Sequence, residues 1–232
     1  MNDRASPIDD PGEARAVPLR RPPLLRRLFG LLRTAHDHVS DWRLNIDTRP
    51  VLCPLPHGVS RFDDGIPSEP LHHFLIKRFI GPLSLGPDDV VIDIGCGTGR
   101  VACVLARRRV KSVVGIEVAR TASLAAQENA ARLRGRRSPV RILTQDAVEG
   151  DYDEGTVFWL YHPFGPETMR AVLDRLAESV RNRPRRIRLA YIHPLHEDIV
   201  TSSEWLRCYA RRSSRLSRLE ASFWTNANGT EA

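Results

Sequence analysis

The sequence has very little lysine and no long apolar run. Only Lys77 and Lys111 are lysines, although lysine and arginine together number 35 in 232 residues. A net charge of +7 and an isoelectric point of about 9.8 would suit a nucleic-acid partner. Basicity supplied almost wholly by arginine in an alanine-rich chain is, however, typical of genomic codon bias. No apolar run approaches the ~20 residues that span a bilayer, so we expect no transmembrane segment.

Cysteine is also scarce, and no two cysteines have the C-x-x-C spacing of a zinc or redox site. The four cysteines are Cys53, Cys96, Cys103 and Cys208. We recognise no secretory leader, so reduced thiols and a cytoplasmic location are expected. With 41% hydrophobic residues, a chain of this length buries a core without disulfide or metal staples.

The composition divides the chain into four parts. Residues 1–22 are rich in proline, aspartate and arginine and are expected to be a disordered tail. Residues 23–67 are expected to form a helix and a proline-rich lid loop. The helix, from Leu24, alternates leucine with arginine. Such a helix either lies on an anionic membrane or, more commonly, docks its apolar face on its own domain. Residues 68–226 are the expected core, and 227–232 a second tail.

Within the core, short β-branched runs alternate with segments of helical periodicity. Apolar strands of this kind predict an α/β fold with a Rossmann-like, mostly parallel seven-stranded sheet and helices on both faces. Alternating segments at 204–210 and 219–225 predict a C-terminal antiparallel β-hairpin. Strands are expected at 90–94, 113–116, 140–143, 157–161 and 187–192, and helices at 71–80, 100–109, 119–133 and 168–180.

A glycine-rich turn follows the first expected strand. It contains Gly95, Gly97 and Gly99, with Asp93 before them and Arg100 after them. Glycines allow a sharp turn and a close approach of the backbone to a ligand. The dinucleotide fingerprint G-x-G-x-x-G needs glycine where Arg100 stands. A carboxylate at the strand end would repel pyrophosphate but suits a ligand with a cationic amino group.

Two further acidic residues follow the next strands. Glu117 ends the second strand about twenty residues after the glycines, where a carboxylate can accept hydrogen bonds from both ribose hydroxyls. Asp146 follows the third strand, beside Ala147, and could accept from an adenine amine. A solvated strand end and a polar residue before a turn are the structural alternatives for these two positions.

This D-x-G-x-G-x-G turn, with acids after the second and third strands, resembles the class I S-adenosylmethionine-dependent methyltransferases. The resemblance covers roughly residues 68–225 and implies S-adenosyl-L-methionine as cofactor. It implies that the three glycines line the methionine and ribose, and that Asp93 lies near the amino-acid part. Glu117 would hold the ribose, and Asp146 with Ala147 the adenine. Asp47-Thr48, the lid and the Pro163-Phe164 turn are most similar to small bacterial proteins grouped with the non-SET lysine methyltransferases.

At the end of the fourth strand, the sequence departs from the family pattern. His162, in Tyr161-His162-Pro163-Phe164, stands where many members have Asn or Asp, which puts transfer to an exocyclic base amine or a glutamine amide in doubt. Methyl transfer needs mainly in-line positioning, and a base where the acceptor carries a proton. His162 and Tyr161 are the candidate catalytic residues. The alternative is that Tyr161 packs on the cofactor and His162 bonds to backbone.

Several alternatives stay open at this point. The expected reaction is methyl transfer to an N or O nucleophile of a small molecule or protein side chain; RNA is a second acceptor class, although no stacking module is visible. A catalytically inactive cofactor-binding regulator is a third, more remote, hypothesis. His72 and His73 could bind a metal with Asp63 and Asp64, but a surface pair is the simpler interpretation and no metal site is predicted. The oligomeric state is not encoded in any visible pattern.

Overall fold

The computed structural model describes residues 24–50, 60–66, 69–214 and 217–226. The tails expected at 1–22 and 227–232 lie outside these ranges. The chain order is α1 (Leu24–Leu44), α2 (His73–Ile80), η1 (Gly81–Leu83), β1 (Val90–Ile94), α3 (Arg100–Leu105), β2 (Ser112–Glu117), α4 (Arg120–Arg132), β3 (Val140–Thr144), η2 (Ala147–Glu149), β4 (Val157–Tyr161), α5 (Pro166–Asn182), β5 (Arg188–Ile192), α6 (Glu197–Ser202), β6 (Arg207–Ser214) and β7 (Leu219–Thr225).

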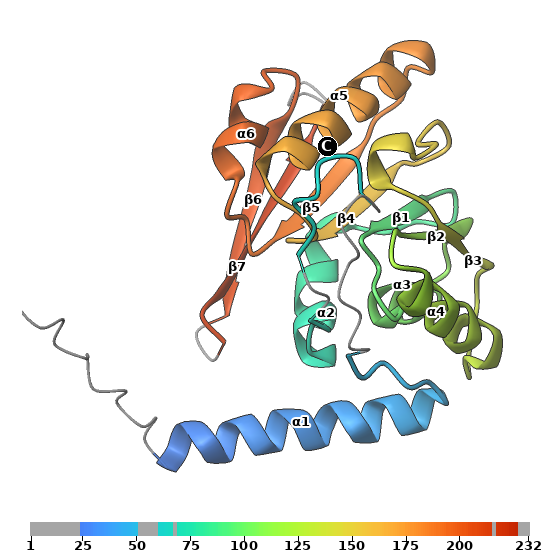
Figure 1. The fold of residues 1–232 in the computed structure, drawn as a ribbon, viewed down its shortest axis with the longest axis vertical. Coiled ribbons are helices and arrows are strands. Elements are labelled where there is room, and N and C mark those ends of the chain that lie inside the picture. Colours follow the sequence, from blue (N-terminus) through green and yellow to red (C-terminus); the bar gives the residue numbers. More distant parts are fainter. Residues whose placement is uncertain (1–23, 51–59, 67–68, 215–216, 227–232) are drawn as a thin grey trace, which may run out of the picture.

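The seven strands form one sheet in the order β3-β2-β1-β4-β5-β7-β6 (Figure 1). The first five strands pair in parallel, and β7 pairs antiparallel with both β5 and β6. The predicted fold class, a mostly parallel seven-stranded α/β sheet with a C-terminal antiparallel hairpin, is therefore confirmed. The helix α6 was not predicted, and β6 lies a few residues later in the chain than expected.

Apolar side chains fill both sides of the sheet. On one side, α2, α3 and α4 cover a cluster that includes Val91 and Trp159. On the other, α5 and α6 cover a second cluster that includes Phe158 and Trp224. Neighbouring residues such as Phe158 and Trp159 point to opposite faces because side chains alternate along a strand. Central strands buried on both faces need the continuous apolar runs that the sequence contains.

The helix α1 lies along the lower side of the molecule in Figure 1, with α2 between it and the sheet. Its bounds fit the predicted amphipathic segment, but apart from Leu44, which joins the core, its described large apolar side chains do not face the body. Leu31 and Trp42 are 69% and 73% exposed, whereas Asp37 and Asp41 are buried. The expectation that α1 docks by its apolar face is therefore wrong. No helix among the described residues is long and apolar enough to cross a membrane.

Candidate functional site

A cavity of about 260 Å³ opens at the carboxyl ends of the parallel strands. Open α/β sheets bind ligands at this edge, where the strand order reverses; here β1 lies between β2 and β4. The cavity brings together six residues that the sequence predicted for the site, one or two from each of four neighbouring strands or the turns after them. These are Gly95, Glu117, Asp146, Ala147, Tyr161 and His162.

The three glycines of the turn have different positions. All have positive φ, 73° at Gly95, 53° at Gly97 and 83° at Gly99. Only Gly95 lines the cavity, and a Cβ there would lie 2.3 Å from the Cβ of Pro163, so no larger residue fits. Gly97 and Gly99 are buried. They shape the turn, and Gly99 also allows the close approach of Ala126 on α4.

Asp93 is buried behind the turn and does not line the cavity. Its Oδ2 has no hydrogen-bond partner among the described residues, and neither does Nε1 of Trp159. The two residues are paired in register on β1 and β4, so their side chains share a sheet face. Burial, together with the nearby Glu117, raises the pKa of Asp93 to about 8. An unpartnered carboxyl oxygen of this kind can receive a cationic amino group, which would favour its ionised form.

Glu117 connects the glycine turn to the end of β2. Its Oε2 accepts from the amide of Gly97 at 2.8 Å, and its Oε1 from the amide of Ala119 at 2.9 Å. Burial raises the pKa of Glu117, although these amides oppose the shift. The residue also lines the cavity. The Val118 amide is a third backbone donor to this carboxylate, so the side chain is held rigidly, and its remaining acceptor capacity suits a hydroxyl ligand.

Asp146 caps the short helix η2 and also holds the lid. Its Oδ1 accepts from the amide of Val148 at 3.0 Å, and its Oδ2 from the amide of Arg61 at 2.8 Å. The structural alternative, a cap before a turn, is therefore present at this position. Asp146 and Ala147 nevertheless line the cavity, so the residue can serve both purposes only if the Arg61 amide shares or yields its acceptor.

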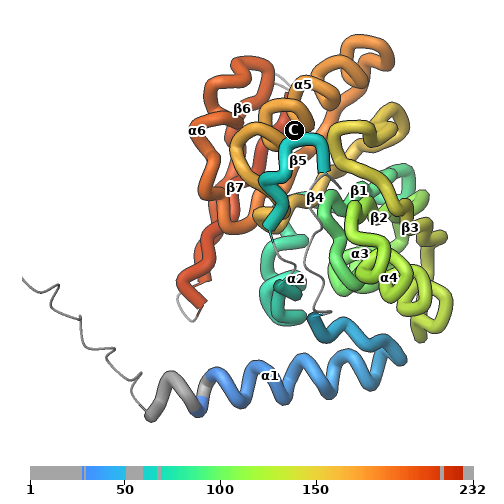
Figure 2. The backbone as a smooth tube through the Cα atoms, viewed as in Figure 1, coloured from blue at the N-terminus to red at the C-terminus, as the bar shows by residue number. Residues whose placement is uncertain are grey.

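Residues 60–66 form the described part of the predicted lid and lie beside the start of α5 (Figure 2). Gly65 forms a β-bridge with Phe164, and the Ile66 amide donates to the carbonyl of Pro163 at 3.1 Å. Asp64 caps α5 by accepting from the amides of Glu167 and Thr168. Ser60, Gly65 and Ile66 line the cavity. The segment thus forms one wall of the cavity. Residues 51–59 lie outside the described residues.

Three imidazoles gather where β4 and β5 end. The ring centroid of His162 lies 5.5 Å from those of both His193 and His196. His162 and His193 have φ of 38° and 55°, a region that residues other than glycine rarely adopt. Both line the cavity, and Nδ1 of His162 has no partner among the described residues. Strained backbone and unpartnered polar atoms are typical of functional sites.

The pKa values of the two candidate bases are shifted in opposite directions. Burial lowers the pKa of His162, and the neighbouring His193 and His196 lower it further. Burial raises the pKa of Tyr161, and the Glu69 carboxylate adds to the shift. Near neutral pH, His162 is therefore a neutral imidazole able to accept a proton, whereas Tyr161 remains a hydroxyl. The electrostatics favour His162 over Tyr161 as a base.

Arg100 is a residue whose role the sequence did not predict. Its side chain turns away from the cavity and is only 6% exposed. Nη1 of Arg100 lies 3.1 Å from Oδ2 of Asp37, and its Nη2 lies 3.2 Å from Oδ2 of Asp41. Both aspartates are on α1. Burial alone would raise the pKa of Asp37, but bonds from His72 and His73 and the Arg100 charge lower it to about 2. Arg100 thus fastens α1 to the helix that follows the glycine turn.

The interpretation of His72 and His73 as a surface pair is wrong. Nε2 of His73 lies 2.6 Å from Oδ1 of Asp41, and Nδ1 of His72 lies 2.6 Å from Oδ2 of Asp37. His73 is 1% exposed. Both histidines belong to the α1 attachment, and Asp64 caps α5 instead of joining them. Over the ranges that the structure describes, no three His, Cys, Asp or Glu side chains form a group that could hold a metal ion.

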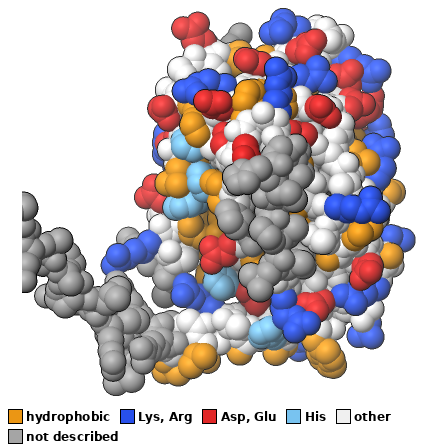
Figure 3. Space-filling view, viewed as in Figure 1, with side chains coloured by type: hydrophobic (Ala, Val, Ile, Leu, Met, Phe, Trp, Pro, Cys, Tyr) orange, Lys and Arg blue, Asp and Glu red, His pale blue; other side chains and the backbone are white. Residues whose placement is uncertain are grey.

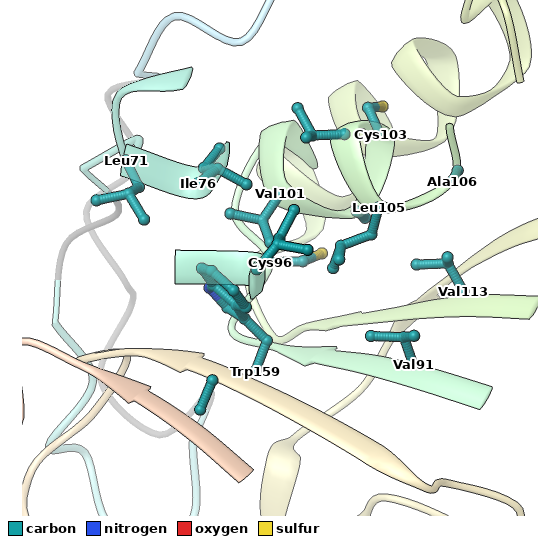
Figure 4. Close-up of a cluster of buried hydrophobic side chains, with 14 of the residues drawn as sticks. Leu71, Ile76, Val91, Cys96, Val101, Cys103, Leu105, Ala106, Val113 and Trp159 are labelled. Carbon is teal, nitrogen blue, oxygen red and sulfur yellow. The ribbon is translucent and has the colours of Figure 1, made fainter. Parts of the chain in front are cut away.

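Cys96 lies within the glycine turn but packs into the core. Figure 4 shows it among Val101, Leu105 and Trp159 on the α2–α3 side of the sheet. Burial raises the pKa of the Cys96 thiol well above its usual range, and the nearby Asp93 adds to the shift. A buried thiol that stays protonated is a poor nucleophile. No catalytic role for Cys96 is required.

Comparisons with known proteins agree with this geometry. Residues 91–183 match the family model described as a methyltransferase domain. The ribosomal protein L11 methyltransferases of two Vibrio vulnificus strains are 33% identical over 139 residues, which cover 53% of this chain and 44% of the relative. The chain thus spans less than half the length of the curated relatives it matches.

Solved structures share the fold at low sequence identity. An RNA methyltransferase from Salinibacter ruber, in complex with S-adenosyl-L-homocysteine, has a TM-score of 0.51 at 20% identity, covering 70% of this chain and 97% of its own. Magnesium protoporphyrin IX methyltransferase from Synechocystis, with bound S-adenosylmethionine, has 0.51 at 16% identity, covering 86% and 97%. These likenesses concern the fold alone.

Residues 91–183 thus match a methyltransferase domain, and the chain shares its fold with methyltransferases solved with S-adenosylhomocysteine or S-adenosylmethionine. The family resemblance predicted from the glycine turn and the strand-end acids is confirmed. The narrower likeness to the non-SET lysine methyltransferases stays a prediction, as do the roles of individual site residues.

Proposed function

We propose that the protein is an S-adenosylmethionine-dependent methyltransferase that methylates an N or O nucleophile of a small molecule or a protein side chain. The observation that carries the proposal is the single cavity that unites Gly95, Glu117 and Asp146 with His162. One half of this lining suits an adenosyl group, and the other suits an acceptor. The match to a methyltransferase domain over residues 91–183 supports the assignment.

The residues present fit the donor. Asp93 lies behind the turn and outside the cavity lining, so its unpartnered carboxyl oxygen would attract the amino group from behind the turn. Glu117 would receive the ribose hydroxyls, and Asp146 with Ala147 the adenine. S-adenosylmethionine supplies a methyl group already activated by its sulfonium, so the protein has mainly to position and desolvate. The cavity is slightly smaller than typical small-molecule pockets, about 300 to 1,000 Å³. We therefore expect residues 60–66 to move outward when the donor binds.

The acceptor would enter between His162 and His193, where the imidazoles lie beside Tyr161. The lowered pKa of His162 suits it to remove a proton from a hydroxyl or ammonium. The curated relatives named for ribosomal protein L11 support a protein acceptor over RNA, and the three imidazoles argue against an inactive regulator.

The test of donor binding is calorimetric titration with S-adenosylhomocysteine. Glu117→Ala removes the acceptor proposed for the ribose, and we expect affinity to fall at least about tenfold, the effect of one charge-assisted hydrogen bond. Glu128→Ala, on the exposed side of α4, is the matched control and should bind like the parent. Because Glu117 also holds the glycine turn, the 2′-deoxy analogue should be titrated against the unaltered protein. Equal affinity for this analogue would contradict the ribose assignment.

The acceptor class is tested by methyl incorporation from labelled S-adenosylmethionine into ribosomal protein L11, bulk RNA and small amines or alcohols. Incorporation into protein or a small molecule is expected; exclusive labelling of RNA would favour the second acceptor class. With an acceptor in hand, His162→Ala should lower kcat at least about a hundredfold and abolish the acidic limb of its pH profile. An unchanged acidic limb would assign proton removal to another group.

A further inference from the structure

The face of α1 that points away from the body carries a continuous apolar stripe. Leu28, Leu31, Leu32, Val39 and Trp42 are 53%, 69%, 56%, 50% and 73% exposed. Their spacing, i, i+3, i+4, i+11 and i+14, puts them on one side of the helix. Figure 3 shows hydrophobic side chains along the lower edge of the molecule, over α1. An exposed apolar stripe of this size indicates an interaction surface.

The opposite face of α1 attaches the helix to the body. Asp37 and Asp41, the helix's only acidic residues, are both buried and both lie against Arg100. Their partners His72 and His73 complete the attachment. Because this contact holds the polar side of α1 inward, the apolar stripe is turned to the outside. The exposure of the stripe is therefore fixed by the fold.

The charges left along α1 all have one sign. With both aspartates engaged by the body, the remaining charged residues of the helix are Arg26, Arg27, Arg33 and Arg43. Arg43 is exposed and, by its helical position, borders the apolar stripe. Apolar residues flanked by arginine, with an exposed tryptophan, are typical of helices that lie in the headgroup region of an anionic bilayer.

We propose that α1 binds the surface of an anionic phospholipid membrane through Leu28, Leu31, Leu32, Val39 and Trp42, and holds the methyltransferase domain there. A second copy of this chain fits the surface less well. A second copy would offer no acidic residue of α1 to neutralise Arg43, because Asp37 and Asp41 are buried. An anionic lipid surface supplies both the apolar layer and the opposite charge. One stripe of this size predicts reversible binding. The proposal does not depend on the identity of the methyl acceptor.

The test is flotation of the full chain with phosphatidylcholine vesicles and with vesicles that also contain phosphatidylglycerol. We expect binding to the anionic vesicles, little binding to the neutral ones, and a decrease as salt screens the charges. Leu31→Ser with Trp42→Ser should weaken binding at least about tenfold, because two large apolar side chains no longer enter the bilayer. Leu124→Ser removes a leucine that is 44% exposed on α4, away from the stripe, and is the matched control.

Three results would overturn the proposal. Absence of binding to both kinds of vesicle is the first, and equal binding by the doubly substituted protein is the second. The third is a dimer in sedimentation that the double substitution dissolves, which would assign the stripe to a second copy of the chain. Since both altered residues are exposed, the unfolding temperature should stay within a few degrees of the parent and excludes misfolding as a cause of lost binding.

Discussion

Single residues at the carboxyl edge of the sheet make structural hydrogen bonds and also line the cavity. Asp146 illustrates this, because its two oxygens already cap η2 and hold Arg61 while the residue lines the cavity. Asp93 is different: its Oδ2 is unpartnered among the described residues, so the ligand-free protein buries a carboxyl group that is poorly satisfied. Its protonation state therefore controls stability.

The pKa of Asp93 gives stability a defined pH dependence. The pKa is about 8 in the folded chain against a reference value of 3.8, so folding favours the protonated form. The contribution is full below about pH 4 and is lost as pH rises to about 8. Asp93→Asn stays neutral, so we expect its unfolding free energy to rise relative to the parent across this window, by at most about 1.4 kcal/mol per pH unit. Denaturant unfolding at pH 5 and pH 8 measures the difference.

The control for this experiment is Asp174→Asn, at an exposed position on α5. Its stability relative to the parent should not change between the two pH values. If the difference between parent and Asp93→Asn were also constant with pH, the assigned pKa of Asp93 would be wrong.

At the scale of elements, the attachment of α1 relies on a buried group of charges, and Leu44 at its end adds apolar packing. Arg100, Asp37 and Asp41 are all less than 10% exposed, and each makes more than one hydrogen bond or ion pair. Removing one member of such a buried group leaves the others without a counter-charge, which costs more than the pair contributes when intact.

We expect Arg100→Met to destabilise the protein by about 3 kcal/mol, because Asp37 and Asp41 lose their shared cation. Arg49→Met is the matched control, since the Arg49–Asp47 pair at 2.6 Å has side chains 70% and 45% exposed. That change should cost much less than Arg100→Met, because an exposed ion pair contributes little to stability. Chemical denaturation measures both. A loss at Arg100 no larger than at Arg49 would show that the α1 attachment contributes little.

The sequence predicted best the strands that are buried on both faces of the sheet. The strands at 90–94 and 157–161 occupy the predicted residues, because a β-branched or aromatic run buried on both faces needs no knowledge of its neighbours. The orientation of α1 could not be predicted, because periodicity identifies an apolar face but not what covers it. The histidine and arginine partners of Asp37 and Asp41, which are His72, His73 and Arg100, lie 32 or more residues away along the chain. No local pattern indicates such pairing.

Part of the candidate site could also be predicted from the sequence. Gly95, Glu117 and Asp146 each end or follow a strand, so the parallel sheet alone brings them together. The grouping of His162 with His193 and His196 depends on left-handed backbone at two of the three positions, which sequence does not encode for histidine. The contact of Arg61 with Asp146 depends on where the lid folds back.

At the scale of the whole molecule, the two apolar clusters share the same sheet. Trp159 belongs to the cluster under α2 and α3, and Trp224 to the cluster under α5 and α6. Neither cluster can lose its packing while the strands between them stay ordered. The described core is therefore expected to unfold as one cooperative unit.

Two single-tryptophan variants test this cooperativity. One keeps Trp159 and the other keeps Trp224, with the remaining tryptophans changed to phenylalanine. In each variant, the fluorescence midpoint should coincide with the midpoint from far-ultraviolet circular dichroism. A midpoint for either tryptophan that clearly precedes the loss of secondary structure would mean that the two sides unfold separately.

The position of β7 has a consequence for synthesis on the ribosome. This strand follows all the other described strands in the chain, yet it lies between β5 and β6 in the sheet. Until residue 225 leaves the exit tunnel, β5 keeps an open edge and β6 has no place to pair. An unpaired edge invites association with other nascent chains. Translation of the β6–β7 hairpin is thus the step that closes the sheet, and a ribosome pausing before it would leave an aggregation-prone intermediate exposed.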